Sequence, residues 1–246
     1  ATDEARHSEL MARHVGADHT EVFVSGEDIA AELPNILSSM DQPSVDGVNS
    51  WFVSRATRAS VKVALSGLGS DEIFAGYPHF RRFRQAARLA PRGRPFLAAA
   101  GRLAGSRLPE RFTAIARFIG GTPAERHVQV REIFPAGRKR DLSACFQGEA
   151  TSAATARMLA DDPDPINATA RAEIHGYLVN TLLRDADAMS MTHSLEVRVP
   201  FIDHRVVDFA LSVPARLKIT SQGGKAVLKE AVRDLLPPEI IHRPKS

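Results

Sequence analysis

Residues 61–77, VKVALSGLGSDEIFAGY, carry the pattern that decides the fold. The run opens with a short apolar, β-branched segment, passes through a loop of small residues and ends in an acidic helix start. A helix is expected before it, over 49–60. Helices and strands alternating in this way predict an α/β unit with parallel strands, in which ligands bind beyond the carboxyl ends of the strands. The loop after Leu65 is therefore where chemistry is expected.

The loop that follows this strand offers three features that a nucleotide site needs. Gly67 and Gly69 allow the backbone to approach a ligand closely, and Ser66 adds a hydroxyl group. Asp71 and Glu72 supply the hard oxygen atoms that Mg²⁺ prefers when the ion also bridges phosphates. An ordinary loop before an acidic helix start explains the glycine spacing about as well. The segment is not a P-loop, because no GK[ST] follows.

Periodicity predicts the elements on either side of this unit. Helices are expected over 4–15 and 27–40, the second with a break or a new first turn at Pro34. Between them, residues 19–24 alternate and end in a β-branched and aromatic cluster, which predicts a strand. A further helix is expected over 226–235.

Composition limits the classes of protein. Of the 246 residues 43% are hydrophobic and 25% are charged, which is typical of a soluble globular protein. The net charge of +3 is small and the aromatic share is 6%, so neither favours a nucleic-acid surface. The single cysteine, Cys145, excludes an internal disulfide, and the spacing of the histidines does not match a zinc site. With no apolar run of about 18–20 residues, the cytoplasm is the expected location and no membrane contact is expected.

The middle of the chain changes in composition. Residues 79–107 carry eight arginines and no acidic residue. A solvated basic helix face is the simpler interpretation, and an anionic partner is the alternative. We expect 1–78 to be part of a nucleotide-binding α/β domain, 79–175 to be a helical insertion and 176–246 to be the helical remainder.

Three stretches resemble one known family, in the same order. Residues 63–77 resemble the second signature of the asparagine synthetase family, whose synthetase domain belongs to the ATP-pyrophosphatase group. Residues 190–203 are similar to its SM…EvRvPfLD signature. Gly224-Lys225 and the terminal Arg-Pro-Lys at 243–245 resemble its closing GK…LP…RPK pattern. The resemblance spans nearly the whole chain and is loosest over residues 79–175.

The resemblance implies a fold, a reaction and its partners. The implied fold is α/β, with a parallel sheet of the adenine-nucleotide alpha-hydrolase (Rossmann-like) type, a large helical insertion and a helical C-terminal part. The implied enzyme is a ligase that uses ATP and Mg²⁺ to convert the side-chain carboxylate of aspartate into an acyl-adenylate. Ammonia, supplied by glutamine hydrolysis in a domain outside this chain, then gives asparagine. A homodimer is left open.

Seven residues are expected to form the site, five by the same resemblance and two, Gly69 and Glu72, from the chemistry of the loop. The nucleotide-binding set is Ser66, Gly67 and Gly69, the metal ligand is Asp71, and the catalytic set is Lys225, Lys245 and Glu72. The two lysines match family lysines that hold phosphates and the developing charge, a task suited to a flexible ammonium.

Other residues of these motifs have structural interpretations. Glu196 and Arg198 lie on one face of an extended segment and are expected to form ion pairs with groups elsewhere, with a direct role at the substrate as the alternative. Met189 and Met191 are expected to fill the core, and Asp203 to cap the helix that follows it.

The sequence also departs from the family pattern. Leu68 stands between the two glycines where the family carries Asp or Glu, a candidate base or ammonia-orienting group. Either Glu72 or Asp41 takes that role, or the protein adenylates another carboxylate, such as a peptide or metabolite, for amide or lactam formation. The family's SGGxDS loop and an amino-terminal catalytic cysteine are absent from these residues, so the chain is expected to be a fragment that is inactive alone. A non-catalytic domain that binds an acidic partner through residues 79–107 is the third hypothesis.

Overall fold

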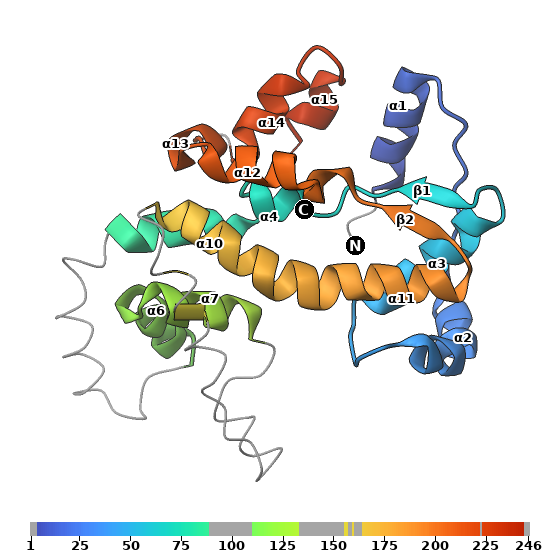
Figure 1. Ribbon diagram of the computed structural model, residues 1–246, viewed down its shortest axis with the longest axis horizontal. Coiled ribbons are helices and arrows are strands. Elements are labelled where there is room, and N and C mark those ends of the chain that lie inside the picture. Colours follow the sequence, from blue (N-terminus) through green and yellow to red (C-terminus); the bar gives the residue numbers. More distant parts are fainter. Residues whose placement is uncertain are drawn as a thin grey trace, which may run out of the picture. The chain divides into compact units, whose positions relative to one another are not determined.

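The computed structural model describes residues 4–88, 110–132, 155–156, 159, 164–221 and 223–243. The chain forms two compact units. Unit 1 comprises Ala1–Leu68, Thr181–Pro200 and Lys225–Ser246, and unit 2 comprises Gly69–Asn180 and Phe201–Gly224. The described residues are mostly helical and contain one small parallel sheet, which confirms the α/β class (Figure 1). The three-part division expected from the sequence remains a prediction.

Unit 1 combines helices with the two-stranded sheet. Its elements are α1 (Ala5–Val15), α2 (Gly26–Ser39), α3 (Gly47–Arg58), β1 (Val63–Leu65), α11 (Arg184–Thr192), β2 (Glu196–Arg198), α14 (Ala226–Ala231) and α15 (Pro238–Ile241). β1 and β2 run parallel and side by side in Figure 1. The core of this unit lies where α2, α3 and α11 meet, and it contains Ile36, Trp51, Phe52 and Met189.

Local signals explain the first helices. α1 ends at Gly16, which adopts the left-handed conformation at φ 65° that glycine tolerates best. α2 begins with a capping box in which Ser25 and Asp28 bond each other's backbone. The helices expected over 4–15, 27–40 and 49–60 are therefore confirmed. The break expected at Pro34 is wrong, because α2 continues through it. Proline removes one N–H donor, and the buried Ile36 holds the following turn in the core.

Two other expectations on unit 1 need correction. Residues 19–24 form neither helix nor strand, and no described strand pairs with them. An alternating pattern gives a strand only when a neighbour satisfies its backbone, and the Phe23 side chain is 89% exposed. The helix expected over 226–235 ends early, at Ala231, and turns follow it.

The described part of unit 2 consists of helices and their connections, with one isolated β-bridge between Thr220 and Gly223. Its elements are α4 (Ser70–Ile73), a helix over 78–88, α6 (Glu110–Gly120), α7 (Pro123–Arg131), α10 (Pro165–Glu173), α12 (His204–Ser212) and α13 (Ala215–Lys218). The π-helix Ile174–Leu183 and the 3-10 helix Pro200–Ile202 each contain a boundary between the units. One core cluster contains Ala75, Phe80, Ile166, Ala170 and Ile219.

Side-chain caps start three of these helices. Thr122 forms a capping box with Glu125 at α7, and Pro123 occupies the first helical position. Asp164 caps α10 by accepting from the amide of Ile166 at 2.9 Å. Asp203 caps α12 by accepting from the amide of Arg205 at 2.9 Å, as expected from the sequence.

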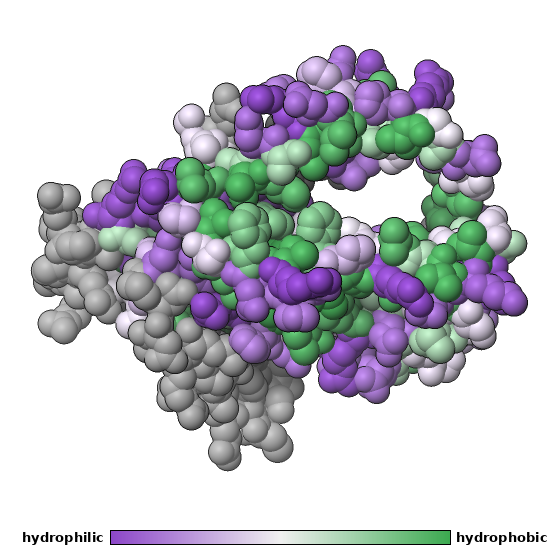
Figure 2. All heavy atoms as spheres, turned by 45° about the horizontal axis from the view of Figure 1, so that its top comes forward, coloured by the Kyte–Doolittle hydropathy of each residue, from purple (hydrophilic) through white to green (hydrophobic). Residues whose placement is uncertain are grey.

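Hydrophobic residues also reach the surface. On the face drawn in Figure 2 they lie between hydrophilic residues. Met189 is fully buried as expected, but Met191 is 56% exposed, so its assignment to the core is wrong. The two side chains lie two residues apart on α11 and so point in different directions.

In the part of the chain that the structure describes, no helix has both the length and the apolar character needed to cross a membrane.

Candidate active site

The small sheet brings two of the motifs together in unit 1. Val63 pairs with Glu196 and Leu65 with Arg198, so both strands end at the same edge. The amide of Ser66, the first residue after β1, donates to the carbonyl oxygen of Arg198 at 2.8 Å. Arg198 also donates through Nε to Glu196 at 2.9 Å, so these two residues pair with each other rather than with groups elsewhere. The sequence-predicted loop therefore leaves the carboxyl edge of a parallel sheet.

Ser66 and Gly67 open this loop. The Ser66 hydroxyl accepts from the amide of Leu68 at 3.3 Å, which holds the turn. A Cβ placed on Gly67 would meet no atom within 4 Å. The space beside Gly67 therefore leaves its backbone accessible, as nucleotide binding would require.

In unit 2, position 69 requires glycine for two physical reasons. Its φ of 90° lies in the left-handed region, which other residues adopt only with strain. A Cβ there would also lie 2.9 Å from Cγ2 of Ile202 and 3.5 Å from Cβ of Phe201. The glycine-rich loop thus packs directly against the Phe201-Ile202 part of the second motif.

Asp71 lies in the first turn of α4 and is partly exposed. Its backbone carbonyl accepts from the amide of Gly76 at 2.8 Å, which closes the turn after the helix. α4 has only four residues, so the macrodipole of aligned peptides adds little to any anion binding at its start.

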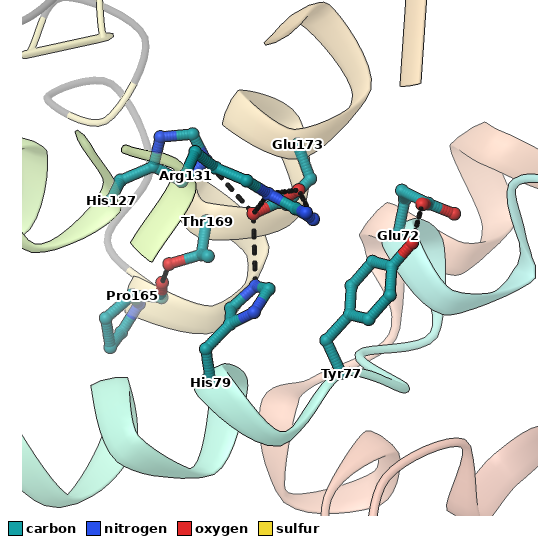
Figure 3. Close-up of polar contacts among 8 residues, drawn as sticks. All are labelled: Glu72, Tyr77, His79, His127, Arg131, Pro165, Thr169 and Glu173. Atoms are coloured by element: carbon teal, nitrogen blue, oxygen red, sulfur yellow. Dashed lines mark hydrogen bonds and ion pairs between the residues drawn. The ribbon is translucent and has the colours of Figure 1, made fainter. Parts of the chain in front are cut away.

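The Glu72 side chain points into the protein, away from solvent. Its side chain is 1% exposed, and the hydroxyl of Tyr77 donates to its Oε1 at 2.6 Å (Figure 3). Burial raises the pKa of the Glu72 carboxyl, although the bond from Tyr77 works against the rise. This environment favours a structural role for Glu72, and its catalytic assignment remains a prediction.

The closing motif also meets this segment within unit 2. A Cβ on Gly224 would lie 2.0 Å from the carbonyl oxygen of Ala75 and 3.1 Å from Cα of Gly76. Lys225 follows in the left-handed conformation at φ 58°, is the N-cap residue before α14 and is partly buried. The backbone therefore turns sharply at the lysine. Lys245 lies outside the described residues.

Asp71 offers a single carboxylate, and its assignment as a ligand of a nucleotide-bound magnesium ion remains a prediction. Within the residues that the structure describes, no group of three or more His, Cys, Asp or Glu side chains could hold a metal ion. Mg²⁺ on phosphates keeps several waters and takes only one or two carboxylates from the protein. A single carboxylate such as that of Asp71 fits this requirement, and an all-protein cage does not.

Comparison with known proteins agrees with the motif geometry. The family model described as Asparagine synthase matches residues 1–246. The chain belongs to the asparagine synthase family. The resemblance inferred from the motifs is thereby confirmed, and the chain corresponds to the C-terminal synthetase domain of these proteins.

Individual relatives cover the chain to different extents. A putative glutamine-hydrolysing asparagine synthetase of Mycobacterium tuberculosis (strain H37Rv) is 32% identical over 251 residues, which cover 95% of this chain and 37% of that protein. Glutamine-hydrolysing asparagine synthetase 1 of Bacillus subtilis is 28% identical over 257 residues, covering 95% of the chain and 38% of that protein. The glutamine-hydrolysing asparagine synthetase of Gallus gallus is 37% identical over 114 residues, which cover 44% of this chain and 20% of that protein. The chain thus spans well under half the length of these relatives.

Sequence reasoning missed the roles of two residues of this asparagine synthase domain. In the sequence, Gly224 is only a member of the Gly224-Lys225 motif, and Tyr77 is only the last residue of the 63–77 motif. Neither the packing of Gly224 nor the partner of Tyr77 has a local signal, because each depends on a contact made in the folded chain. A cavity of about 510 Å³ in unit 2, lined by residues such as Arg82, Phe118 and Gln129, contains none of the predicted site residues.

Proposed function

We propose that this asparagine synthase domain catalyses the ATP-dependent amidation of aspartate to asparagine through an aspartyl-adenylate. The observation that carries the proposal is the meeting of motifs around one turn, where Gly69 packs on Ile202 and Gly224 packs on Ala75. Glutamine hydrolysis in a domain outside this chain would supply the ammonia. A Rossmann-like sheet, a cytoplasmic location and a homodimer remain predictions.

The loop residues would bind and orient the nucleotide. Ser66 and Gly67 follow the end of β1 with an open backbone, and Gly69 turns the chain into α4. In the first step the aspartate side-chain carboxylate attacks the α-phosphorus of ATP, and pyrophosphate leaves. In the second, ammonia attacks the activated carbonyl, and AMP leaves. The loop holds the phosphates in line for the first step.

Charged residues would stabilise the leaving group. Asp71 would hold Mg²⁺, which neutralises the charge gathering on pyrophosphate. Lys225 and Lys245 would contact phosphate oxygens as point charges. Lys225 has a left-handed backbone, and the packing of Gly224 on Ala75 restrains the residue before it.

Exchange of labelled pyrophosphate into ATP tests this function in the full-length protein. Exchange should depend on aspartate, and Asp71→Asn should lower its rate by at least about 100-fold. Asp208→Asn on α12 is the matched control, because Asp208 is exposed and outside the motif turn, and it should leave exchange unchanged. Exchange that ignores aspartate would refute the substrate, and an active Asp71→Asn would refute the metal ligand.

Leu68 favours a second candidate, a related synthetase that adenylates another carboxylate. A leucine neither removes a proton nor orients ammonia, so the base-like position of the family is not filled here. A panel of acids tested for pyrophosphate release separates the candidates. Release with a peptide or metabolite acid and none with aspartate would select the second. Release with aspartate alone would reject it.

A further inference from the structure

The buried carboxylate of Glu173 organises the helices of unit 2. It lies at the end of α10 with no exposed surface, and its Oε1 is 3.0 Å from Nε2 of His79 and 3.1 Å from Nε2 of His127 (Figure 3). Arg131 donates from Nε to Oε2 at 3.0 Å, and its Nη2 also bonds this oxygen. Burial alone would raise the pKa of Glu173, but the bonds from both histidines and Arg131 hold it well below its usual range. Glu173 therefore stays ionised and holds three side chains.

Arg131 connects this carboxylate with two tyrosines. Its guanidinium carbon lies 4.9 Å from the ring centroid of Tyr77 and 3.7 Å from that of Tyr177. A guanidinium over an aromatic face is attracted to it, and more strongly when water is excluded. His79 stacks on the Tyr77 ring with centroids 5.3 Å apart and an interplanar angle of 21°. Glu173 thus restrains Tyr77 twice, through Arg131 and through His79.

Tyr77 passes this restraint to α4. Its hydroxyl donates to Glu72 at 2.6 Å. Burial and this bond raise the pKa of Tyr77, so the phenol keeps its proton and remains a donor. Glu72 is the residue directly after Asp71, and neighbouring residues on a helix point about 100° apart. A fixed Glu72 therefore sets the direction of Asp71.

We propose that Tyr77 is a positioning residue for Asp71, held in place by Glu173 through Arg131 and His79. The inference rests on the proposed function, in which Asp71 holds the metal. A helix of four residues has too few internal bonds to keep its own orientation. The hydrogen bond between Tyr77 and the buried Glu72 fixes the orientation of α4. The carboxylate of Asp71, on the exposed side, therefore keeps its direction.

Hydrogen exchange in the full-length protein tests the positioning without using activity. The probe is the amide of Gly76, which bonds to the carbonyl of Asp71. Tyr77→Phe removes only the hydroxyl and should speed exchange of this amide roughly tenfold or more. Tyr177→Phe is the matched control, because it deletes the same group from the other ring beside Arg131, and it should change the rate by less than about twofold.

Glu72, which accepts the hydrogen bond from Tyr77, gives a second pair of variants. Glu72→Gln keeps an oxygen that accepts from Tyr77, so the Gly76 amide should stay slow. Glu72→Ala has no acceptor and should speed exchange as Tyr77→Phe does. Equal rates in the Gln and Ala variants would overturn the proposal. So would faster exchange throughout unit 2, which is the mark of a merely structural role.

Metal affinity separates this inference from the proposed function. Mn²⁺ binding in the presence of ATP, followed by electron paramagnetic resonance, should weaken several-fold in Tyr77→Phe and more in Asp71→Asn. Unchanged binding in Tyr77→Phe alone would overturn the positioning role. Unchanged binding in Asp71→Asn would refute the metal assignment of the proposed function, and the exchange rates would then decide the positioning of α4 by themselves.

Discussion

Gly224 lies so close to Ala75 that a Cβ on it would stand 2.0 Å from the Ala75 carbonyl oxygen. The same Cβ would lie 2.9 Å from the carbonyl carbon of Ala75, so the obstacle is backbone and not a flexible side chain. Ala75 is itself buried and left-handed at φ 57°. The glycine before Lys225 therefore serves as a packing surface for the turn that follows Asp71.

Gly224→Ala should destabilise the fold by about 3 kcal/mol or more, since two backbone segments must separate. Urea unfolding of the full-length protein measures the loss. Gly67→Ala is the control, because a Cβ there meets no atom within 4 Å, and it should stay within about 0.5 kcal/mol of the parent. Equal stability of the two variants would show that the Gly224 contact does not exist in solution.

Gly69→Ala should cost about 1–3 kcal/mol, from the strain of a positive φ and from the contact with Ile202. Combining it with Ile202→Ala removes the contact and leaves the strain. The double-mutant cycle should therefore show a favourable coupling of about 1 kcal/mol. Strict additivity would mean that the backbone conformation alone requires glycine.

Glu173→Gln should destabilise unit 2 by about 2–4 kcal/mol, because it leaves the mostly buried guanidinium of Arg131 without its counter-charge. Glu230→Gln removes one side of the exposed pair with Arg233 and should cost less than about 1 kcal/mol. Denaturant unfolding compares the two. A Glu173→Gln protein as stable as Glu230→Gln would contradict the central role of this carboxylate.

The stabilisation by Glu173 should also depend on pH. Its pKa in the folded chain lies below the ordinary value of 4.5, so the unfolded chain binds the proton more readily. The stabilisation is therefore present above about pH 4.5 and is lost as the pH falls below it. The difference in unfolding free energy between the parent and Glu173→Gln should shrink between pH 6 and pH 3. A constant difference would mean that Glu173 is not preferentially ionised in the fold. The pKa of Glu72 is raised, so the pH dependence of its contribution to stability has the opposite sign and the contribution is lost as the pH rises.

Local sequence signals determined much of unit 1. The capping box at Ser25, the glycine after Val15 and the periodicity of 49–60 depend only on residues close in the chain, and the predicted helices are present. Pairing of residues 19–24 could not be judged in this way, because a strand depends on a partner elsewhere. The ordered motifs were sufficient to identify the family, which the comparison confirmed.

The sequence alone determined the family and predicted which residues carry the chemistry, because a glycine loop, an aspartate and a lysine in order are readable without a structure. Only the tertiary structure decided how they are held. It turned Glu72 inward to Tyr77 and left Asp71 partly exposed, although the two carboxylates are neighbours with the same residue chemistry. It also gathered His79, His127 and Arg131 around Glu173. Burial and long-range contacts separate such residues, and neither is encoded in local spacing.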